Sequence, residues 1–266
     1  MVARWAVEGM GDAPPRSPTA CGSLPPEGAN FPWGGPAENF APRLTIVMPV
    51  LNEGSGLAHA LRALQPLIAR GAQVIVVDGG SVDDSLAQAQ APGVAQVLSA
   101  PRGRALQMNA GAARADGDLL LFLHADTALP PQADLLVARA LADGVHVWGR
   151  FDVRIAGRAK TLRVVSAAMN LRSRVSGIAT GDQALFMTRA AFDAVGGFPA
   201  QPLMEDIEIS RHLLRLSRPA CLRQQVLTSG RRWDTRGVWR TVLLMWRLRY
   251  AYWRGTPVEQ LAQRYR

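Results

Sequence analysis

The amino-acid sequence predicts an α/β protein with a mostly parallel central sheet flanked by helices. Apolar runs of four to six residues, rich in Val, Ile and Leu, alternate with longer stretches of helical pattern, which is typical of βαβ units. Three of these runs end abruptly at polar clusters that contain carboxylates, in the segments 44–53, 74–84 and 119–126. Because a parallel sheet gathers its ligand groups at the carboxyl ends of its strands, we expect the three clusters to form one site.

The expected elements begin after Arg43 and alternate between strand and helix. Uninterrupted apolar runs indicate strands buried on both faces, and right-handed crossovers should connect them. Strands are expected at 44–48, 73–77, 95–98, 118–123 and, with an alternating pattern, 146–155. Helices are expected at 55–70, 81–91, 104–115, 131–142, 160–176, 189–195, 205–216 and 238–255.

Length and composition indicate one full-sized domain with extensions at both ends. The chain has 266 residues, of which 48% are hydrophobic, enough for a large core. Residues 1–42 hold eight of the eighteen prolines and show no apolar periodicity, which predicts disorder or a start codon placed too far upstream. We therefore divide the chain into an N-terminal extension (1–42), a catalytic domain (43–235) and a basic, aromatic C-terminal helix with its tail (236–266).

The positive charge is concentrated at one end of the chain. Of the formal net charge of +9, the segment 231–266 contributes +7, with nine arginines against Asp234 and Glu259. So local an excess does not by itself indicate a nucleic-acid partner, and we expect none. Cys21 and Cys221 are the only cysteines, which favours a reducing, cytoplasmic location.

The C-terminal segment VWRTVLLMWRLRYAYWRG (238–255) combines helical periodicity with aromatic residues and four arginines. One interpretation is an interfacial helix, with aromatic anchors and a cationic face toward anionic lipid at the inner side of a membrane. The other is a terminal helix that packs on the domain or on a second copy in a homodimer. The sequence has no apolar run of eighteen residues, so we expect no membrane span. No apolar signal-peptide region follows Arg4 at the N-terminus, so we expect no secretion.

Each of the three polar clusters has a structural and a chemical interpretation. Glu53 could accept hydrogen bonds from a ribose or a base, or could cap the following helix. The glycines after Asp78 permit a close ligand approach, or make an ordinary strand-turn-helix junction. Neither cluster carries a GxGxxG or a GxxxxGK[ST] motif. Asp126 suits Mg²⁺ or Mn²⁺, which prefer oxygen ligands, and His124 could be a second ligand, a substrate contact or a capping neighbour.

Together these segments resemble glycosyltransferase family 2, the inverting nucleotide-sugar enzymes of the GT-A fold. The matching segments are PVLNE at 49–53, VDGGSVD at 77–83, HAD at 124–126, where the family typically has DxD, and MEDIE at 204–208. The resemblance covers about residues 43–235. A bacterial subgroup of the arsenosugar-biosynthesis type is similar in RGRALQMNAGA (102–112), TGDQALFM (180–187), GGFP (196–199) and TSGRRW (228–233).

The resemblance implies a metal-dependent enzyme that takes a nucleoside-diphosphate sugar as donor and a hydroxyl group as acceptor. Asp78 would face the base and Asp126 would bind the divalent cation that bridges the diphosphate. Arg102 and Arg104 precede a helix, where guanidinium and backbone N–H groups could both meet phosphate oxygens. The expected donor-side residues are Pro49, Glu53, Asp78, Gly79, Asp83, Arg102, Arg104, Asn109 and His124.

The acceptor side is expected from three later segments. By family position, Gly181, Asp182 and Gln183 would form an acceptor-side wall. Glu205 and Asp206 stand before a helix, where the macrodipole favours acids; the family pattern makes Asp206 the base and Glu205 a supporting contact. Arg232 and Trp233 fall where processive relatives carry QxxRW, and the missing glutamine favours a non-processive enzyme in which Arg232 neutralises diphosphate and Trp233 stacks on a sugar or packs in the fold.

Two other functions fit parts of the sequence. A nucleotidyltransferase or sugar-nucleotide pyrophosphorylase would need a basic, glycine-rich loop directly after the first strand, and PVLNEGSG has no basic residue. A non-catalytic nucleotide-sugar or membrane-surface binding protein would use the basic C-terminal helix as its working part. The acid pair at Glu205 and Asp206 argues against that second alternative.

Overall fold

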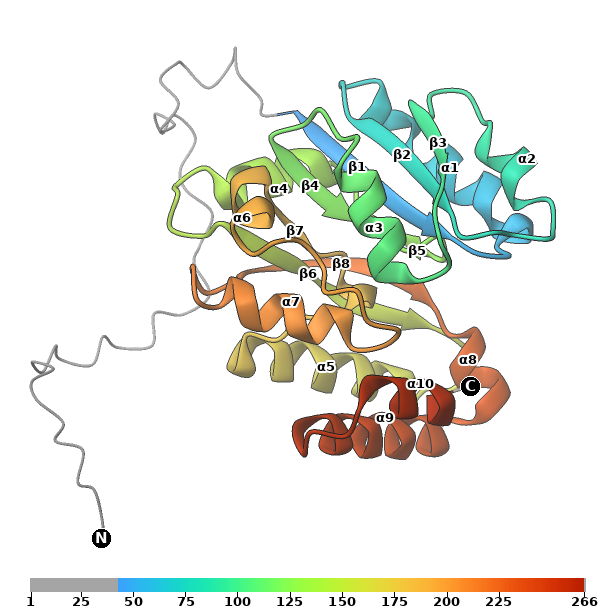
Figure 1. Ribbon diagram of the computed structural model, residues 1–266, viewed down its shortest axis with the longest axis vertical. Helices are drawn as coiled ribbons and strands as arrows, with labels where there is room; N and C mark the ends of the chain where they lie inside the picture. The colour runs from blue at the N-terminus through green and yellow to red at the C-terminus, as the bar shows by residue number, and fades with distance from the viewer. Residues whose placement is uncertain (1–42, 266) are drawn as a thin grey trace, which may run out of the picture.

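The structure, a computed structural model, describes residues 43–265 and contains a single sheet between two layers of helices (Figure 1). The disorder expected for 1–42 lies outside these residues. Eight strands are ordered β3-β2-β1-β4-β7-β6-β8-β5 across the sheet. The strands are β1 (Leu44–Val50), β2 (Gln73–Asp78), β3 (Gln96–Ser99), β4 (Leu119–Phe122), β5 (Thr127–Ala128), β6 (Trp148–Ala156), β7 (Phe186–Thr188) and β8 (Ala220–Ser229).

Parallel pairing dominates the sheet, which confirms the predicted fold class. Strand β1 pairs in parallel with β2 and β4, β2 with β3, and β6 with β8. Strand β7 runs antiparallel between β4 and β6, and β5 pairs antiparallel with β8 at the edge. The antiparallel pairs lie in the half of the sheet that is built from the later part of the chain.

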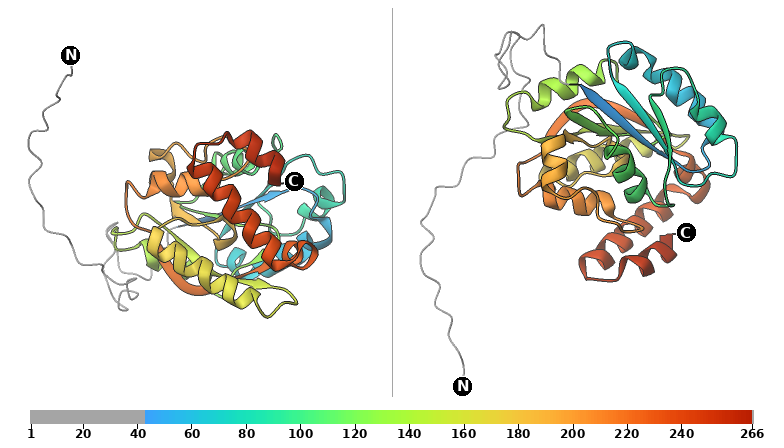
Figure 2. Two further views of the ribbon diagram at one scale, coloured as in Figure 1. Left: turned by 90° about the horizontal axis from the view of Figure 1, so that it is seen from below. Right: turned by 45° about the horizontal axis from the view of Figure 1, so that its top comes forward.

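The helices follow the strands in the predicted alternation. They are α1 (Gly54–Ile68), α2 (Ser85–Ala89), α3 (Arg104–Ala112), α4 (Ala133–Leu141), α5 (Leu162–Ser176), α6 (Arg189–Ala194), α7 (Glu205–Leu213), α8 (Arg231–Arg236), α9 (Val238–Trp253) and α10 (Val258–Tyr265), with the 3-10 turn η1 at Gly181–Gln183. The view on the right of Figure 2 shows α1 and α3 on opposite sides of the sheet.

The two faces of the sheet bury separate apolar clusters. Every residue of β1 and β2 is buried, and their side chains alternate between the clusters as the two-residue repeat of a strand requires. On one face Ile46 and Met48 pack with α1, α4 and the start of α5. On the other face Val47 and Ile75 pack with α3, α6 and α7. The core thereby fixes which helices, and which helix N-termini, border the carboxyl edge of the sheet.

The sequence prediction missed the strands β5, β7 and β8 and the helices α8 and α10, and it made one helix too long. The helix expected at 81–91 is only Ser85–Ala89, because the turn before it is held by side-chain bonds to Asp78 and Asp83. Strand β7 is too short for a clear pattern. Strand β8 was not predicted because the polar residues at 223–225, which lie at a register shift opposite Phe151 and Asp152, interrupt its apolar pattern.

A topological switch point lies between β1 and β4. From β1 the chain adds β2 and β3 on one side, and it then returns to add β4 on the other side. The connections therefore diverge at the carboxyl ends of β1 and β4, and open α/β sheets bind ligands at such a position. Glu53 follows β1 and Asp126 follows β4, so both predicted carboxylates border this position.

The C-terminal helices α9 and α10 pack against each other and against the start of α7. Leu248 and Leu261 are buried with Met204, and Tyr252 donates a hydrogen bond to Glu208 Oε2 at 2.7 Å. Figure 1 and the right view of Figure 2 show the two helices at the lower edge of the fold, and the left view, from below, shows them in front of it. One face of α9 is thus packed on the domain, as one of the two interpretations predicted. Within residues 43–265 no helix combines the length and the apolar character that a membrane crossing requires.

Candidate active site

Arg231 joins the ends of β1 and β4 at the switch point. Its Nη2 lies 2.8 Å from Glu53 Oε2 and 3.8 Å from Asp126 Oδ2. The hydrogen bond and charge of Glu53, and then the charge of Asp126, raise the pKa of the Arg231 guanidinium. The first and third of the predicted polar clusters therefore lie close together. Arg231, the first residue of α8, just after β8, bridges them.

The second cluster forms a tight loop beside the first. Asp78 is only 5% exposed, and it accepts hydrogen bonds from the backbone N–H groups of Gly80 and Ser81. Asp83 accepts from the backbone N–H of Gly54 at 3.1 Å and from both the N–H and the hydroxyl of Ser85. Asp83 thus links the start of α1 to the loop that carries Asp78, so its carboxylate shapes the site by holding this loop.

Asp206 lies at the N-terminus of α7 with its carboxylate fixed by backbone donors. Its Oδ2 accepts from the Gly181 N–H at 3.0 Å and its Oδ1 from the Ile207 N–H at 2.8 Å. Met204, the residue just before the first residue of α7, takes a left-handed conformation with φ of 66°, which is unfavourable for a residue with a side chain. This turn directs Glu205 and Asp206 from the helix start toward the turn at Gly181.

His124 connects the end of β4 with this acidic region. Its Nδ1 lies 3.3 Å from Asp182 Oδ1. A Cβ atom on Gly181 would come within 2.6 Å of the imidazole Cε1 and 2.7 Å of Nε2, so only glycine fits there. His124, Asp182 and Asp206 consequently gather around one turn, η1, although they are far apart in the sequence.

The carboxyl groups of this region differ in proton affinity. Burial raises the pKa of Asp206, and the hydrogen bonds from Gly181 and Ile207 only partly oppose this. Burial and the neighbouring charge of Asp206 raise the pKa of Glu205. Burial also acts to raise the pKa of Asp182, but the hydrogen bond and charge of His124, with the charges of Arg104 and Arg232, outweigh it and lower that pKa. Separated proton affinities of this kind suit acid–base chemistry.

Two predicted arginines belong to the same electrostatic cluster. The charge of Arg104, from the first turn of α3, acts on Asp182, Glu205 and Asp206. Arg232 lies where both Asp182 and Asp126 attract it, and its guanidinium stacks 4.1 Å from the centre of the Tyr265 ring. The positively charged side chains of Arg104 and Arg232 therefore lie between the carboxylate near the switch point and the carboxylates near η1.

Arg172 is a candidate site residue that the sequence patterns missed. It comes from α5; burial lowers the pKa of its guanidinium, and the charge of Asp206 is the main force that opposes the shift. Its Nε and Nη2 are buried without a hydrogen-bond partner among the described residues. No sequence pattern indicates this role, because only the tertiary structure brings the Arg172 side chain within range of the Asp206 charge.

Four predicted site residues make contacts within the fold. Pro49 is buried within β1, past the last residue that pairs with β4, so no ladder bond needs its missing N–H. Asn109 donates to the carbonyl of Phe198 at 2.7 Å and accepts from its N–H at 2.9 Å, which occupies both ends of the amide. Gln183 is fully buried, and Trp233 packs against the main core. These contacts give the four residues structural roles, and their predicted ligand contacts stay predictions.

Two further predicted residues lie at the border of the site. A Cβ atom on Gly79 would meet the Gln107 amide at 2.9 Å, and that amide donates to the carbonyls of Val50 and Val77 at the ends of β1 and β2. Gly79 is therefore needed for the close packing of both strand ends. Arg102 is exposed on the turn before α3.

The cluster at the switch point is compatible with a divalent cation. Within residues 43–265 no three His, Cys, Asp or Glu side chains gather into a metal cage. Mg²⁺ and Mn²⁺ in nucleotide sites commonly use one or two carboxylates and complete their shells with water and phosphate oxygens. Asp126, whose side chain is 32% exposed, can serve as such a carboxylate. His124 is directed instead toward Asp182 and Gly181, which argues against it as a ligand.

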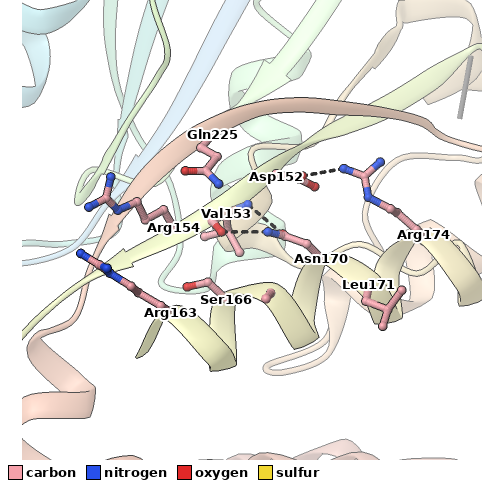
Figure 3. A pocket seen from close by; sticks show the side chains of 10 residues that line it. Asp152, Val153, Arg154, Arg163, Ser166, Asn170, Leu171, Arg174 and Gln225 are labelled. Atoms are coloured by element: carbon pink, nitrogen blue, oxygen red, sulfur yellow. Dashed lines mark hydrogen bonds and ion pairs between the residues drawn. The ribbon is translucent and has the colours of Figure 1, made fainter. Parts of the chain in front are cut away.

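A separate groove of about 610 Å³ lies between β6 and α5 (Figure 3). Three of its polar side chains, those of Asp152, Asn170 and Arg174, are bound within the fold. Asp152 binds Arg174 and the fully buried Arg150, while the Asn170 amide bonds both the N–H and the carbonyl of Val153. These contacts tie α5 to β6, and none of the carboxylates gathered around η1 lines the groove.

The switch point of the sheet, the loop after β2 and the acid pair that opens α7 are those of the GT-A glycosyltransferase fold. Residues 45–196, more than half of the chain, match the family described as Glycosyl transferase family 2. The chain belongs to this family.

Among curated relatives, an uncharacterized glycosyltransferase of Mycobacterium tuberculosis is 36% identical over 125 residues, 44% of this chain and 48% of the relative. An undecaprenyl-phosphate 4-deoxy-4-formamido-L-arabinose transferase of Klebsiella pneumoniae is 33% identical over 153 residues, 53% of this chain and 46% of the relative. The chain spans about half the length of these relatives.

Solved structures support the fold. A mannosyltransferase of Pyrobaculum calidifontis, in complex with GDP-Man and Mn²⁺, has a TM-score of 0.57 at 21% identity, covering 80% of this chain and 62% of that one. Glucosyl-3-phosphoglycerate synthase of Mycobacterium tuberculosis, in complex with Mn²⁺, UDP and phosphoglyceric acid, has a TM-score of 0.53 at 21% identity, covering 71% of this chain and 69% of that one.

Proposed function

We propose that the chain is an inverting, metal-dependent, non-processive glycosyltransferase that moves one sugar from a nucleoside diphosphate to a hydroxyl acceptor. The observation that carries the proposal is the position of Asp206. Its carboxylate is fixed by two backbone N–H groups, its pKa is raised by burial, and it shares a cluster with arginines that also border the switch point. A proton acceptor and a phosphate-binding edge therefore adjoin each other.

The donor half is assigned to the ends of β1, β2 and β4. Asp78 would accept hydrogen bonds from the nucleoside, in a loop that Asp83 holds in place. Glu53 would take part through its ion pair with Arg231. Asp126 would hold Mg²⁺ or Mn²⁺, and the bound cation would stabilise the negative charge of the leaving diphosphate. The arginines Arg104 and Arg232 add fixed positive charge on the same path.

The acceptor half is assigned to η1 and the start of α7. Asp206 takes the proton of the acceptor hydroxyl while the acceptor oxygen bonds to the anomeric carbon and the bond from that carbon to the diphosphate breaks. One displacement of this kind inverts the anomeric configuration, and it needs a single base. Asp182, bound to His124, and the buried Arg172 would border the acceptor.

The substitution Asp206→Asn tests this assignment. The amide keeps an oxygen for one of the two backbone donors but cannot take a proton, so release of nucleoside diphosphate from the donor should fall by roughly 10²–10⁴-fold. Donor binding should be retained, and the loss of one hydrogen bond should lower the melting temperature only slightly. Asp193→Asn, the same change at an exposed position on α6, is the control and should leave turnover unchanged. Near-normal transfer by the Asp206 variant would show that the base has been assigned wrongly.

We propose a cellular setting from the composition of the chain and from its relatives. Low cysteine use favours the cytoplasm, and the relatives named as undecaprenyl-phosphate transferases favour work at the inner face of a membrane. Membership in the arsenosugar-biosynthesis subgroup rests on the four motifs that suggested it and stays a prediction. Transfer assays with soluble and lipid-linked acceptors side by side would distinguish these settings.

A further inference from the structure

Helix α9 presents a continuous row of large apolar side chains to solvent. Because successive members are four or three residues apart, they lie along one side of the helix. The row consists of Trp239, Leu243, Trp246, Tyr250 and Trp253, which are 72%, 58%, 69%, 63% and 78% exposed. An exposed row of this size in a folded domain indicates an interaction surface.

The fold holds this row outward. The opposite side of α9 carries Thr241 and Leu248, which are 2% exposed, and Leu248 packs with Met204 and Leu261. Tyr252 is bonded to Glu208 on α7. Rotation of α9 to bury the apolar row would break these contacts, so the row cannot be satisfied within the chain as it is folded.

Positive charge accompanies the apolar row. Arg240, Arg247 and Arg254 each follow a tryptophan of the row by one position, and all three are exposed. From Thr235 to Val258 the sequence contains five arginines and no Asp or Glu. Aromatic side chains with flanking cations are the composition of helices that lie in the headgroup region of a bilayer.

We propose that this face of α9, the row with Arg240, Arg247 and Arg254, binds an anionic lipid bilayer with the helix parallel to the surface. A second copy of the chain is a poorer occupant, because it would place arginines against arginines without an acid to pair them. Anionic headgroups supply the missing negative charge, and the interface accepts Trp and Tyr rings. The arginines also exclude a transmembrane orientation for the helix.

The surface adjoins the catalytic cluster without being part of it. Tyr252 of α9 bonds α7, the helix that begins with Glu205 and Asp206, and Tyr265 of α10 stacks on Arg232. The same helical pair therefore supports the acceptor half and carries the apolar row. Lipid binding does not depend on the reaction proposed above, and it is measured without turnover.

The test is sedimentation of the full chain with vesicles of phosphatidylcholine alone and of phosphatidylcholine with 30% phosphatidylglycerol. One variant combines Arg240→Gln, Arg247→Gln and Arg254→Gln; a second combines Trp239→Ser, Trp246→Ser and Trp253→Ser. The control combines Arg62→Gln, Arg114→Gln and Arg139→Gln, which removes the same charge from exposed positions on or beside α1, α3 and α4. Unchanged melting temperature and nucleotide binding verify that the variants are folded.

Wild type and control should bind the anionic vesicles, and bind neutral vesicles at least 10-fold less. The arginine variant should lose roughly 10–100-fold on anionic vesicles, since each cation near the surface contributes to binding. The tryptophan variant should lose at least 10-fold. Equal loss in control and arginine variant would show a non-specific charge effect and overturn the proposal. Absence of wild-type binding to anionic vesicles would also overturn the proposal. So would a dimer of the chain that is lost in the tryptophan variant and kept in the others.

Discussion

Gly181 occupies a tightly packed position in the site. Its N–H binds Asp206, and the His124 ring lies where a methyl group would project. A single methyl group there should therefore disturb the base and the imidazole together.

We predict that Gly181→Ala costs roughly 1–3 kcal/mol of unfolding free energy through overpacking, and removes most activity. The matched control is Gly56→Ala in α1, where no atom lies within 4 Å of the new Cβ. That change should stabilise by about 0.5–1 kcal/mol, since alanine favours the helix. Chemical denaturation measures both. Equal stability changes in the two variants would contradict the contact between Gly181 and His124.

The raised pKa of Glu205 makes stability depend on pH in a definite direction. The folded protein holds this proton more tightly than the unfolded chain, so the stabilising contribution is complete below the ordinary pKa of 4.5 and is lost as pH rises through the folded value. Glu205→Gln mimics the protonated form. It should raise stability at pH 7.5 by on the order of 1 kcal/mol and change it little at pH 4.5. Melting curves of the variant and the wild type at both pH values test this. The same difference in stability between the two proteins at pH 7.5 and at pH 4.5 would refute it.

Single residues also show what sequence patterns can reveal. Carboxylates that end apolar runs could be recognised from the sequence, because the carboxyl ends of parallel strands meet at one edge of a sheet. Asn109 and Gln183 belong to two other motifs, yet the Asn109 amide bonds the backbone of Phe198 in a distant loop and the Gln183 amide bonds the N–H of Thr180 in its own turn. Arg172 had no motif. Whether a polar side chain serves a ligand or its own fold depends on tertiary contacts, which the sequence does not display.

At the scale of elements, the loop after α6 is held to α3 through Asn109. Asn109→Ala would leave the N–H and the carbonyl of Phe198 without their partner, at a cost of roughly 1–3 kcal/mol. Gln88→Ala is a suitable control, because Gln88 makes one long bond of 3.4 Å to Asp84 at an exposed site. Thermal unfolding should separate the two variants by several degrees; equal melting temperatures would mean that the loop is held by other contacts.

Elements with strong periodicity were predicted well, and those defined by pairing were not. The βα alternation up to α4 follows from apolar runs that must be buried. Strand β8 depends on its partner β6, and its register shift hides the pattern. The helix α8, which supplies Arg231 and Arg232, begins only where β8 ends, so its contribution to the switch point could not be expected from local sequence.

At the scale of the whole molecule, the sheet order turns separate sequence motifs into two adjoining halves. The parallel strands β1, β2 and β4 supply the proposed donor half, while η1 and α7 supply the proposed acceptor half. The chain crosses the sheet between them, and arginines from α3 and α8 stand at the boundary. One domain thereby combines a phosphate-binding edge with a fixed base.

The most direct measurement is the thermal shift of wild type and Asp126→Ala with UDP-, GDP- and dTDP-sugars, each with and without Mn²⁺. At a hundredfold excess over its dissociation constant, the true donor should stabilise wild type by about 2.7 kcal/mol, only with Mn²⁺. For a chain of this size that is roughly 5–10 °C. Asp126→Ala should lose the Mn²⁺-dependent shift, whereas Asp193→Ala should keep it. A wild type that no nucleotide sugar stabilises, or an Asp126 variant with the full shift, would contradict the proposed donor site.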